Sequence, residues 1–501
     1  MSLMGLDIGT TGCKATVMSV NGDVLAQSYR EYNLLSLQKG YFELDSKEVW
    51  KKIKEIIKDV ASQTKKDPIK AFSVSSFGEG VTPVSKDREI LGNCIVCFDP
   101  RGQKEALKME KKISPKELYN INGNIMGHMY SAPKIMWLKY HEQKVYDKAF
   151  KFLLMEDFVF FMMGCEAVTD YSMADRTLLF DIKSGDWSDK LLKVSGIDKS
   201  KLSKAMPSGT KIGSISDSIA QELGLPKCVE AVTGGHDQCC TALGAGIIKE
   251  GMAAYGIGTV ICITVAYSKM PDKKIMFKNN LNIEHHTAPG LFVSLLYNYT
   301  GGSGLKWFRD TFGAEEKRIA KETGRDVYDV MLENLPSGPT DILTLPHFVS
   351  TGPPLFESRS KGVIAGLTLD TKKEEILKSV LEGVTYYFKE GVDYMNNAGI
   401  KIKEFRATGG GAKSKKWLQI KADIFGVPFV TLKVNEAGSI GTAILAGTGI
   451  GEYSNIKEAV ETLVKTGKTI YPNKENHKKY IEKVELYKQM FPAMKNILHK
   501  I

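Results

Sequence analysis

The chain has 501 residues, 43% of them hydrophobic and 25% charged, a composition typical of a soluble globular protein with two or three domains. Its formal net charge of +10 comes from lysines dispersed through helix-like segments such as residues 46–60, which favours a solvated surface over a nucleic-acid partner. No signal peptide or membrane-length apolar run is evident and the eight cysteines are scattered, so we expect free thiols, a cytoplasmic location and no membrane partner.

The first predicted elements form a small antiparallel sheet followed by a helix and a strand. Residues 5–29 are expected to form strand, Gly-Thr turn, strand, Asn21-Gly22 hairpin turn and strand. A helix is predicted from Asp45, with Glu48 completing a capping box. The apolar stripe of this helix comprises Val49, Ile53, Ile56, Ile57 and Val60. A strand at 71–76 then leads into a loop.

An internal sequence repeat predicts two similar domains. "LDIGTTGCKATVM" at 6–18 resembles "YGIGTVICITVAY" at 255–267, and each reads as a strand, a Gly-Thr turn and a second strand. The second copy begins about halfway along the chain, as a duplication would place it. We therefore expect a first domain at 1–247 and a second at 248–501.

The second half contains a clear amphipathic helix and a glycine-rich turn. The helix is predicted at 374–395, with Ile376, Val380, Val384 and Tyr387 on one face. After the turn "TGGGAKS" at 408–414, a helix should bury Trp417, Ile420 and Ile424, and residues 427–432 form a short strand. The small-residue segment 437–451 is expected to be a closely packed helix, and residues 454–501 are expected to be helical and peripheral.

Three glycine turns are candidates for binding phosphate. In "DIGTTGCK" at 7–14, backbone amides and threonine hydroxyls could wrap a phosphate, and Asp7 could reach a metal ion. A plain β-turn explains this stretch equally well on its own. The second Gly-Thr turn at 256–260 and the turn at 408–414, which opens a helix, favour a nucleotide. Neither the P-loop pattern nor Gly-x-Gly-x-x-Gly is present.

The segment "TGGHDQCC" at 233–240 combines several reactive residue types. Adjacent Cys239 and Cys240 do not easily point at one zinc ion, and the Cys-x-x-Cys at 94–97 lacks a second pair. Nothing nearby supplies the third group that a Cys-His nucleophile needs. Buried thiols are therefore favoured over metal ligands.

Taken together, these stretches resemble the FGGY carbohydrate kinases of the actin-like ATPase superfamily. The resemblance is carried by "DIGTTGCK" at 7, "SFGEG" at 76, "FDPRG" at 98, "TGGHDQ" at 233, "GIGTV" at 256, "GGSGLKWFRD" at 301, "ATGGGAKSKKWLQIKADIFGVP" at 407 and "EAGSIGTAILAGTGIG" at 436. It implies an α/β fold with two similar actin-like (ribonuclease H-like) domains, each a mixed β-sheet flanked by helices, and a cleft between them. It also implies ATP and Mg²⁺ as cofactors, and a homodimer is one assembly to consider.

The resemblance implies roles for particular residues. Asp237 matches the catalytic base, and an ordinary carboxyl pKa near ~4 would leave it ionised at neutral pH. The implied substrate-binding set is Glu79, Asp99, Arg101, His236, Asp237 and Gln238. The implied nucleotide-binding set is Thr10, Thr11, Lys14, Gly258, Thr259, Gly302, Lys306, Gly410, Gly411, Ala412 and Ser414. Asp7, directly or through water, and Asp237 are the implied magnesium ligands.

Substrate choice is where the sequence departs from familiar members of the family. Gly78 stands where glycerol kinases carry arginine, and Cys97 stands where many members carry tryptophan. A site without that bidentate donor and aromatic wall should admit a bulkier ligand than glycerol. We expect a kinase for a small sugar, sugar acid or polyol, with a pentulose or hexulose preferred. The alternative is a catalytically weak actin-like ATPase that acts as a sugar-responsive binding module.

Overall fold

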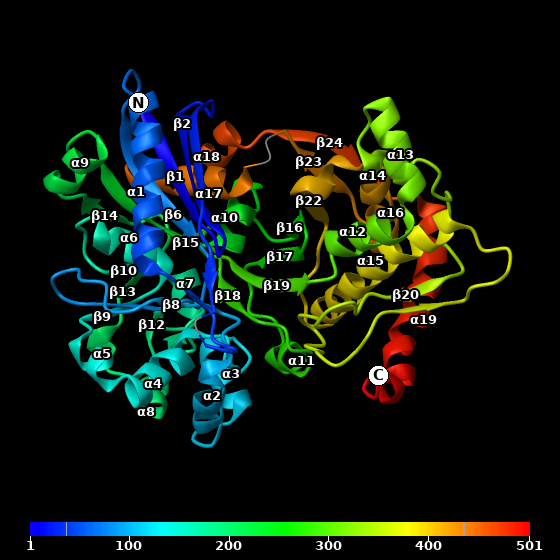
Figure 1. The fold of residues 1–501 in the computed structure, drawn as a ribbon, viewed down its shortest axis with the longest axis horizontal. Helices are drawn as coiled ribbons and strands as arrows, with labels where there is room; N and C mark the ends of the chain where they lie inside the picture. The colour runs from blue at the N-terminus through cyan, green and yellow to red at the C-terminus, as the bar shows by residue number, and fades with distance from the viewer. Residues whose placement is uncertain (37, 434–435) are drawn as a thin grey trace. The chain divides into compact units, whose positions relative to one another are not determined.

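The computed structural model describes residues 1–36, 38–433 and 436–501, and it divides into two compact units (Figure 1). The first comprises 1–248, 282–293 and 436–465, and the second comprises 249–281, 294–435 and 466–501. The expected boundary at 247/248 lies beside the division at 248/249. Two later segments nevertheless pack with the first unit, so neither unit is one continuous stretch.

The first unit is built on a six-stranded mixed sheet of order β14-β15-β6-β1-β2-β3. Its strands are β1 (Ser2–Ile8), β2 (Gly12–Ser19), β3 (Val24–Glu31), β6 (Ile69–Ser76), β14 (Lys211–Ser214) and β15 (Glu230–His236). β1, β2 and β3 pair antiparallel, which confirms the predicted opening sheet and the strand at 71–76. β1, β6 and β15 are parallel neighbours, so their carboxyl ends share one edge.

The two faces of β1 are covered by different helices. Met4, Leu6 and Ile8 belong to the core cluster that includes the apolar stripe of α1 (Ser46–Gln63). Asp45 caps this helix as predicted, accepting from the backbone amides of residues 47 and 48. On the other face, a Cβ added at Gly5 would lie 2.2 Å from the Thr442 hydroxyl of α17 (Ala437–Gly449). This close crossing explains why α17, far along the chain, belongs to the first unit.

Small residues let α17 touch α10 (Asp237–Gly244) backbone to backbone. A Cβ added at Gly441 would lie 2.0 Å from the carbonyl oxygen of Cys240, and one added at Gly244 would lie 1.7 Å from that of Ala437. Real Cβ atoms do not come this close, so each glycine is required by the packing. The predicted close-packed helix at 437–451 is confirmed.

The second unit repeats the topology of the first. Its strands belong to a seven-stranded sheet of order β18-β19-β17-β16-β22-β23-β24, in which β18 (Glu284–His285) falls in the first unit. The strands are β16 (Met252–Ile257), β17 (Ile261–Tyr267), β19 (Phe292–Asn298), whose first two residues fall in the first unit, β22 (Glu404–Thr408), β23 (Phe429–Leu432) and β24 (Thr466–Ile470). β16 pairs antiparallel with β17 and parallel with β22, as β1 pairs with β2 and β6. The two copies of the sequence repeat, at 6–18 and 255–267, therefore occupy equivalent positions in the two sheets.

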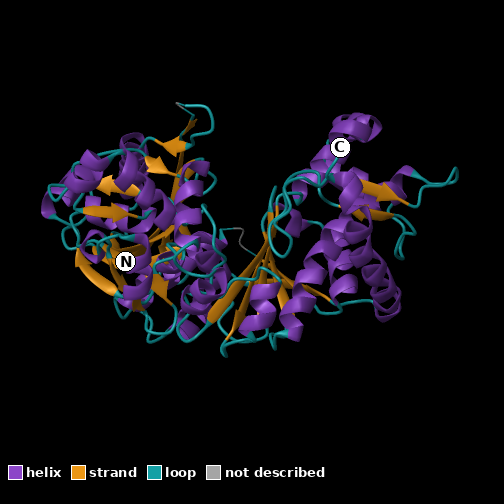
Figure 2. Ribbon diagram, turned by 90° about the horizontal axis from the view of Figure 1, so that it is seen from below, coloured by secondary structure: helices purple, strands orange, loops and turns teal. Residues whose placement is uncertain are grey.

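The predicted helices of the second unit are present, with one correction at the end of the chain (Figure 2). α15 (Lys373–Asn397) and α16 (Lys415–Phe425) bury Val380, Val384, Tyr387 and Trp417 as expected. Residues 454–501 were expected to be helical, but β24 lies between α18 (Ile456–Leu463) and α19 (Lys474–Leu498). β24 is an exposed edge strand, so its polar sequence carries no apolar alternation. None of the helices in the described residues combines the length and apolar character needed to cross a bilayer.

Candidate active site

The carboxyl edge of the first sheet brings the predicted acids together. Ile8 at the end of β1 is in register with Ser76 on β6, and Ser76 is in register with His236 on β15. Asp7 lies one residue before this line, and Asp237 follows it directly. Such an edge is where open α/β sheets bind ligands.

Asp237 is the first residue of α10. Its side chain is 34% exposed, but its Oδ1 atom is buried and has no hydrogen-bond partner among the described residues. Burial, followed by the negative charge of Asp7, raises the pKa of Asp237 to about 7. This corrects the expected pKa near 4, which assumed a solvated carboxyl group. An acid with this pKa is suited to exchange a proton near neutral pH.

Asp7 is held from β6 and lies under α17. Ser75 donates a hydrogen bond to its Oδ1 at 3.0 Å, and burial raises its pKa. A Cβ added at Gly438 would lie 3.9 Å from its Oδ2. Lys14, expected to add charge for a phosphate, instead forms an ion pair with Glu436 at 2.7 Å. Glu436 lies 422 residues from Lys14 along the chain, so no local sequence pattern predicts this ion pair.

The turn that carries Thr10 and Thr11 is fixed by its carbonyl groups. The amide of Gly9 donates to the carbonyl of Gly12 at 2.9 Å, and the amide of Tyr32 donates to that of Thr11 at 3.2 Å. The Tyr32 hydroxyl also donates to the carbonyl of Gly9. These bonds use the carbonyl groups of Gly9, Thr11 and Gly12 as acceptors, and both threonines reach the surface. The turn therefore keeps the donor-rich character expected of a phosphate loop.

Glu79, in the loop after β6, has an unusual backbone conformation. Its φ is +63°, a left-handed conformation that is uncommon for non-glycine residues. Its carbonyl accepts hydrogen bonds from Ser131 and Lys134, each at 3.1 Å. Its carboxylate is bonded to the guanidinium of Arg176. Three partners thus hold a strained residue in place, as is frequent at functional sites.

Arg176 changes the interpretation of Gly78. A Cβ added at Gly78 would lie 3.1 Å from the Arg176 Cγ and 3.1 Å from the His236 Cδ2. A guanidinium is therefore present beside residue 78, although it comes from the end of α7 (Tyr171–Asp175). This guanidinium is paired with Glu79 and Glu284, so it differs from an arginine carried at position 78 itself. Arg176 and Glu79 are 97 positions apart, and no local pattern links them.

Asp99 and Arg101 form a closed buried unit. Arg101 donates to Asp99 through Nε at 2.9 Å and Nη2 at 2.8 Å, and its Nη1 lies 2.7 Å from Glu43. The guanidinium also lies over the rings of Tyr41 and Trp137, at 4.2 and 4.9 Å from their centroids. The two rings also meet each other edge-on, with their centroids 5.9 Å apart.

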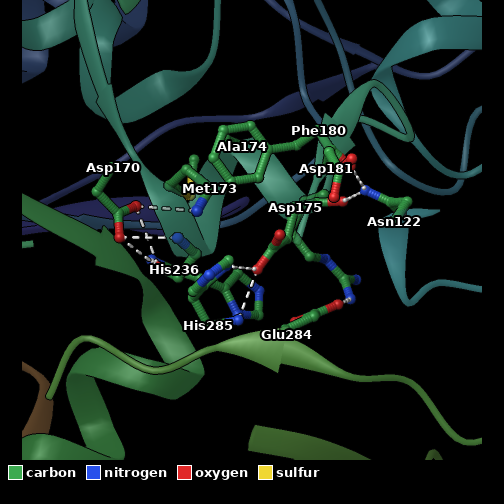
Figure 3. Close-up of polar contacts among 12 residues, drawn as sticks. Asn122, Asp170, Met173, Ala174, Asp175, Phe180, Asp181, His236, Glu284 and His285 are labelled. Atoms are coloured by element: carbon green, nitrogen blue, oxygen red, sulfur yellow. Dashed lines mark hydrogen bonds and ion pairs between the residues drawn. The ribbon is translucent and has the colours of Figure 1, made fainter. Parts of the chain in front are cut away.

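Buried acidic residues position the strand end before Asp237, and Figure 3 shows one of them, Asp170. The amide of His236 donates to the Ser172 hydroxyl at 2.9 Å, and that hydroxyl donates to Asp170. Glu156, on α6 (Met155–Met162), accepts from the amides of Gly234 at 2.7 Å and Asp170 at 3.1 Å. The two carboxyl groups therefore fix the backbone from which His236 and Asp237 project.

His236 and Gln238 flank the candidate base. Burial, with a smaller effect from Arg176, lowers the pKa of His236 well below its usual value. The ring is then neutral at physiological pH, so its Nε2 atom, 3.3 Å from Asp237 Oδ1, does not form an ion pair. Gln238 is half-buried in the first turn of α10, and its hydrogen bonds oppose the rise in the Asp237 pKa.

The cysteines play the structural role expected of them. Cys239 and Cys240 are fully buried, and burial raises the pKa of each thiol well above its usual value. All eight cysteines are free. Within the ranges that the structure describes, no group of three or more His, Cys, Asp or Glu residues could hold a metal ion.

The glycine turns of the second unit converge at the end of β16. The amide of Gly302, which opens α12 (Gly302–Phe312), donates to the carbonyl of Gly258 at 2.9 Å, and the amide of Ser303 donates to that of Thr259 at 3.2 Å. A Cβ added at Gly411 would lie 2.3 Å from the Ile257 Cγ2. Lys306 is not part of this group, because it is exposed and paired with Asp310 at 2.7 Å.

The turn that contains Gly410 leads to a cavity lined in part by lysines. A Cβ added at Gly410 would meet nothing within 4 Å, and Ser414 caps α16 by accepting from the Trp417 amide. A cavity of about 350 Å³ lies beside the turn, within the size range of ligand pockets. Ala412, Lys413, Lys415 and Lys468 are among its lining residues. A larger cavity of about 630 Å³ in the same unit is lined by none of the glycine turns.

Comparison with known proteins identifies the family. The FGGY carbohydrate kinase N-terminal domain matches residues 2–244, and its C-terminal domain matches residues 253–450. The chain is 28% identical over 497 residues to a xylulose kinase of Bacillus subtilis, covering 99% of this chain and 97% of that protein. It is 29% identical over 490 residues to a gluconokinase of Bacillus subtilis, covering 95% and 93%.

The fold is also that of solved members. A xylulose kinase from Rhodospirillum rubrum superimposes with a TM-score of 0.89 at 23% identity, with all of both chains covered. These matches agree with the duplicated α/β units and with the chain-long set of motifs. The chain belongs to the FGGY family of carbohydrate kinases.

Proposed function

We propose that this carbohydrate kinase transfers the γ-phosphate of ATP to a hydroxyl of a small sugar, sugar acid or polyol, with Asp237 as the general base. The observation that carries the proposal is the buried, unpartnered Oδ1 of Asp237 at the carboxyl edge of the first sheet. A ketose is the preferred substrate and glycerol is disfavoured. The xylulose kinase and gluconokinase relatives support a sugar-like acceptor.

In the proposed reaction, the ionised Asp237 accepts a hydrogen bond from the attacking hydroxyl and takes its proton as the O–P bond forms. The neutral His236 and the bound strand end fix the position of the carboxylate. Phosphoryl transfer depends mainly on alignment and charge stabilisation, so the rigidity of this edge is the chief contribution of the first unit. We assign substrate binding to Glu79, Asp99, Arg101, His236 and Gln238.

The residues present suit ATP and Mg²⁺. Magnesium typically takes one or two protein carboxylates and completes its shell with water and phosphate oxygens, and Asp7 and Asp237 supply two mutually repelling carboxylates. Bound magnesium would neutralise phosphate charge. For the nucleotide we assign Thr10, Thr11 and Lys14 in the first unit, with Lys14 released from Glu436, and Gly258, Thr259, Gly302, Gly410, Gly411, Ala412 and Ser414 in the second. The lysine-lined cavity beside Ala412 supports this assignment.

The proposal is tested by measuring sugar-dependent ADP release over a panel of ketoses, polyols and sugar acids. Asp237→Asn should lower turnover by about 10²- to 10⁴-fold, because the base is lost, while calorimetry still detects ATP binding. Asp87→Asn, in an exposed turn of the same unit, is the matched control and should keep full activity. Undiminished turnover in Asp237→Asn would refute the assigned base. No ADP release with any compound would favour a sugar-responsive binding module.

A further inference from the structure

Arg176 is shared between two carboxylates that arrive from separate parts of the first unit. It is bonded to Glu79 after β6, and its Nη1 lies 2.7 Å from Oε1 of Glu284 on β18 (Glu284–His285). The side chains of Arg176, Glu79 and Glu284 are only 8%, 5% and 0% exposed, respectively. We call Glu79, Arg176 and Glu284 the arginine triad. Its two carboxylates and one guanidinium together carry one net negative charge, and this charge is buried away from solvent.

The arginine triad is anchored by a second pair of neighbouring residues. Asp175 precedes Arg176, and its Oδ2 accepts from both the backbone amide and the ring Nδ1 of His285, at 2.6 and 3.0 Å. Figure 3 shows Asp175 beside His285, with Glu284 next along the strand. Two consecutive residues at the end of α7 thus bind two consecutive residues of β18. This double attachment holds the guanidinium in one orientation.

The arginine triad adjoins the candidate base. Gly78 lies in contact distance of both Arg176 and His236, as its added Cβ shows, and His236 immediately precedes Asp237. Glu79 is also the residue that we assign to substrate binding. The charge of the triad therefore acts on whatever sugar lies beside Asp237.

The cations at this edge already have partners, whereas some acceptors do not. Arg101 is bound by Asp99 and Glu43, Lys14 by Glu436, and Lys134 by the carbonyls of Glu79 and Met129. In the described part of the chain, Oε2 of Glu284 and Oδ1 of Asp237 are buried without a hydrogen-bond partner, as is the ring Nδ1 of His236. Such oxygens require donors. A sugar hydroxyl can donate, but a sugar carboxylate cannot.

A carboxylate substrate would meet unfavourable electrostatics at this edge. It would add a charge beside Asp7, Asp237, Glu79 and Glu284, which are all acidic. To bind a guanidinium it would have to displace one of the present carboxylates and leave that group buried and unpaired. Because desolvation strengthens these effects, the penalty falls selectively on acids.

We propose that the arginine triad makes the sugar site select uncharged ketoses or polyols and exclude sugar acids. The proposal rests on the sugar-kinase function proposed above. It distinguishes between the two substrate types named by the relatives of this chain, a xylulose and a gluconate. Glu284 is the specificity-determining residue, because it occupies the guanidinium of Arg176. Without Glu284, a carboxylate of the substrate could bind that guanidinium instead.

The test compares neutral substrates with sugar acids of the same carbon number, and in the second pair the compounds differ only at the charged carbon. D-xylulose against D-xylonate, and D-glucitol against D-gluconate, are assayed with the full-length protein for ADP release and, separately, for binding by thermal shift. For wild type we expect at least one neutral compound to exceed its matched acid at least 100-fold in kcat/KM and to raise Tm where the acid does not. An acid used as well as its neutral partner would overturn the inference and leave the kinase function standing.

Variants at Glu284 provide the second part of the test. Glu284→Gln should reduce the preference for neutral over acidic substrates at least tenfold, and Glu284→Asp, which keeps the charge, should restore it. An unchanged preference in a folded Glu284→Gln protein overturns the assignment to the triad. If that variant does not fold, the wild-type substrate pairs decide alone. If no compound yields ADP, the kinase function fails, whereas thermal shift by neutral compounds only would still support charge selection.

Discussion

The contact between α10 and α17 can be tested by adding a single methyl group. In Gly441→Ala the new Cβ would lie 2.0 Å from the carbonyl oxygen of Cys240, where ordinary contact begins at 3.4 Å. The two helices would have to separate by about 1.4 Å, or the backbone would have to deform. Overpacking of this kind costs about 3 kcal/mol. For a unit of this size, we expect Tm to fall by about 5 °C.

The same displacement should reduce activity, because α10 begins with Asp237. A shift of about 1 Å in a catalytic group can lower turnover about 100-fold. Gly441→Ala is therefore assayed by thermal unfolding and by sugar-dependent ADP release at a temperature where it remains folded. We expect kcat to fall more than the affinity for ATP, which we assign largely to the second unit.

Gly438→Ala provides a control in the same helix. Its added Cβ would meet the Thr241 hydroxyl at 3.5 Å, an ordinary contact, and alanine favours helix formation by up to about 1 kcal/mol over glycine. Its Tm should equal or slightly exceed that of wild type. A Gly441→Ala protein with wild-type Tm would show that the helices do not approach as described, and it would refute the reasoning.

Three further predictions follow from burial and charge at the same edge. Because the pKa of Asp237 is raised to about 7, kcat/KM measured with both substrates well below KM should fall about tenfold per pH unit below pH 7; a limb near pH 4 would contradict this. The folded protein binds a proton at Asp237 that the unfolded chain releases near its ordinary pKa of 3.8, so the carboxyl group increasingly destabilises the fold as pH rises from about 4 to 7. Asp237→Asn should consequently raise the free energy of unfolding at pH 8 by about 1–2 kcal/mol, a figure discounted for the partial exposure of the side chain. Its Tm should therefore exceed that of wild type at pH 8 and equal it at pH 4. The double variant Cys239→Ser with Cys240→Ser should keep most of its turnover, since neither buried thiol acts in the reaction; a tenfold loss of kcat in a folded protein would assign the thiols a functional role.

Local patterns were sufficient for most elements of the fold. The strands around the Gly-Thr turns, the apolar stripe of α1 and that of α15 were all predicted, because each depends on residues close to one another along the chain. β24 was missed because an exposed edge strand buries no alternating face. The chain-long motifs also identified the family before any distance was known.

The site depended on contacts that sequence proximity does not reveal. Arg176 meets Glu79 and Glu284 from 97 and 108 positions away, and Lys14 meets Glu436 from 422 positions away. The identity of Asp237 could be inferred from its motif, but its pKa could not. A pKa is set by burial and by neighbouring charges such as Asp7, and these exist only once the chain is folded.

The sequence by itself thus determined the repeated strand-turn-strand units, the glycine turns and Asp237 as the candidate base. The tertiary structure decided that α17 belongs to the first unit, that a guanidinium stands beside Gly78, and that Glu79 and Glu284 are paired with it. The physical reason is that hydrophobic period and turn chemistry act over a few residues, whereas packing and electrostatics act through space.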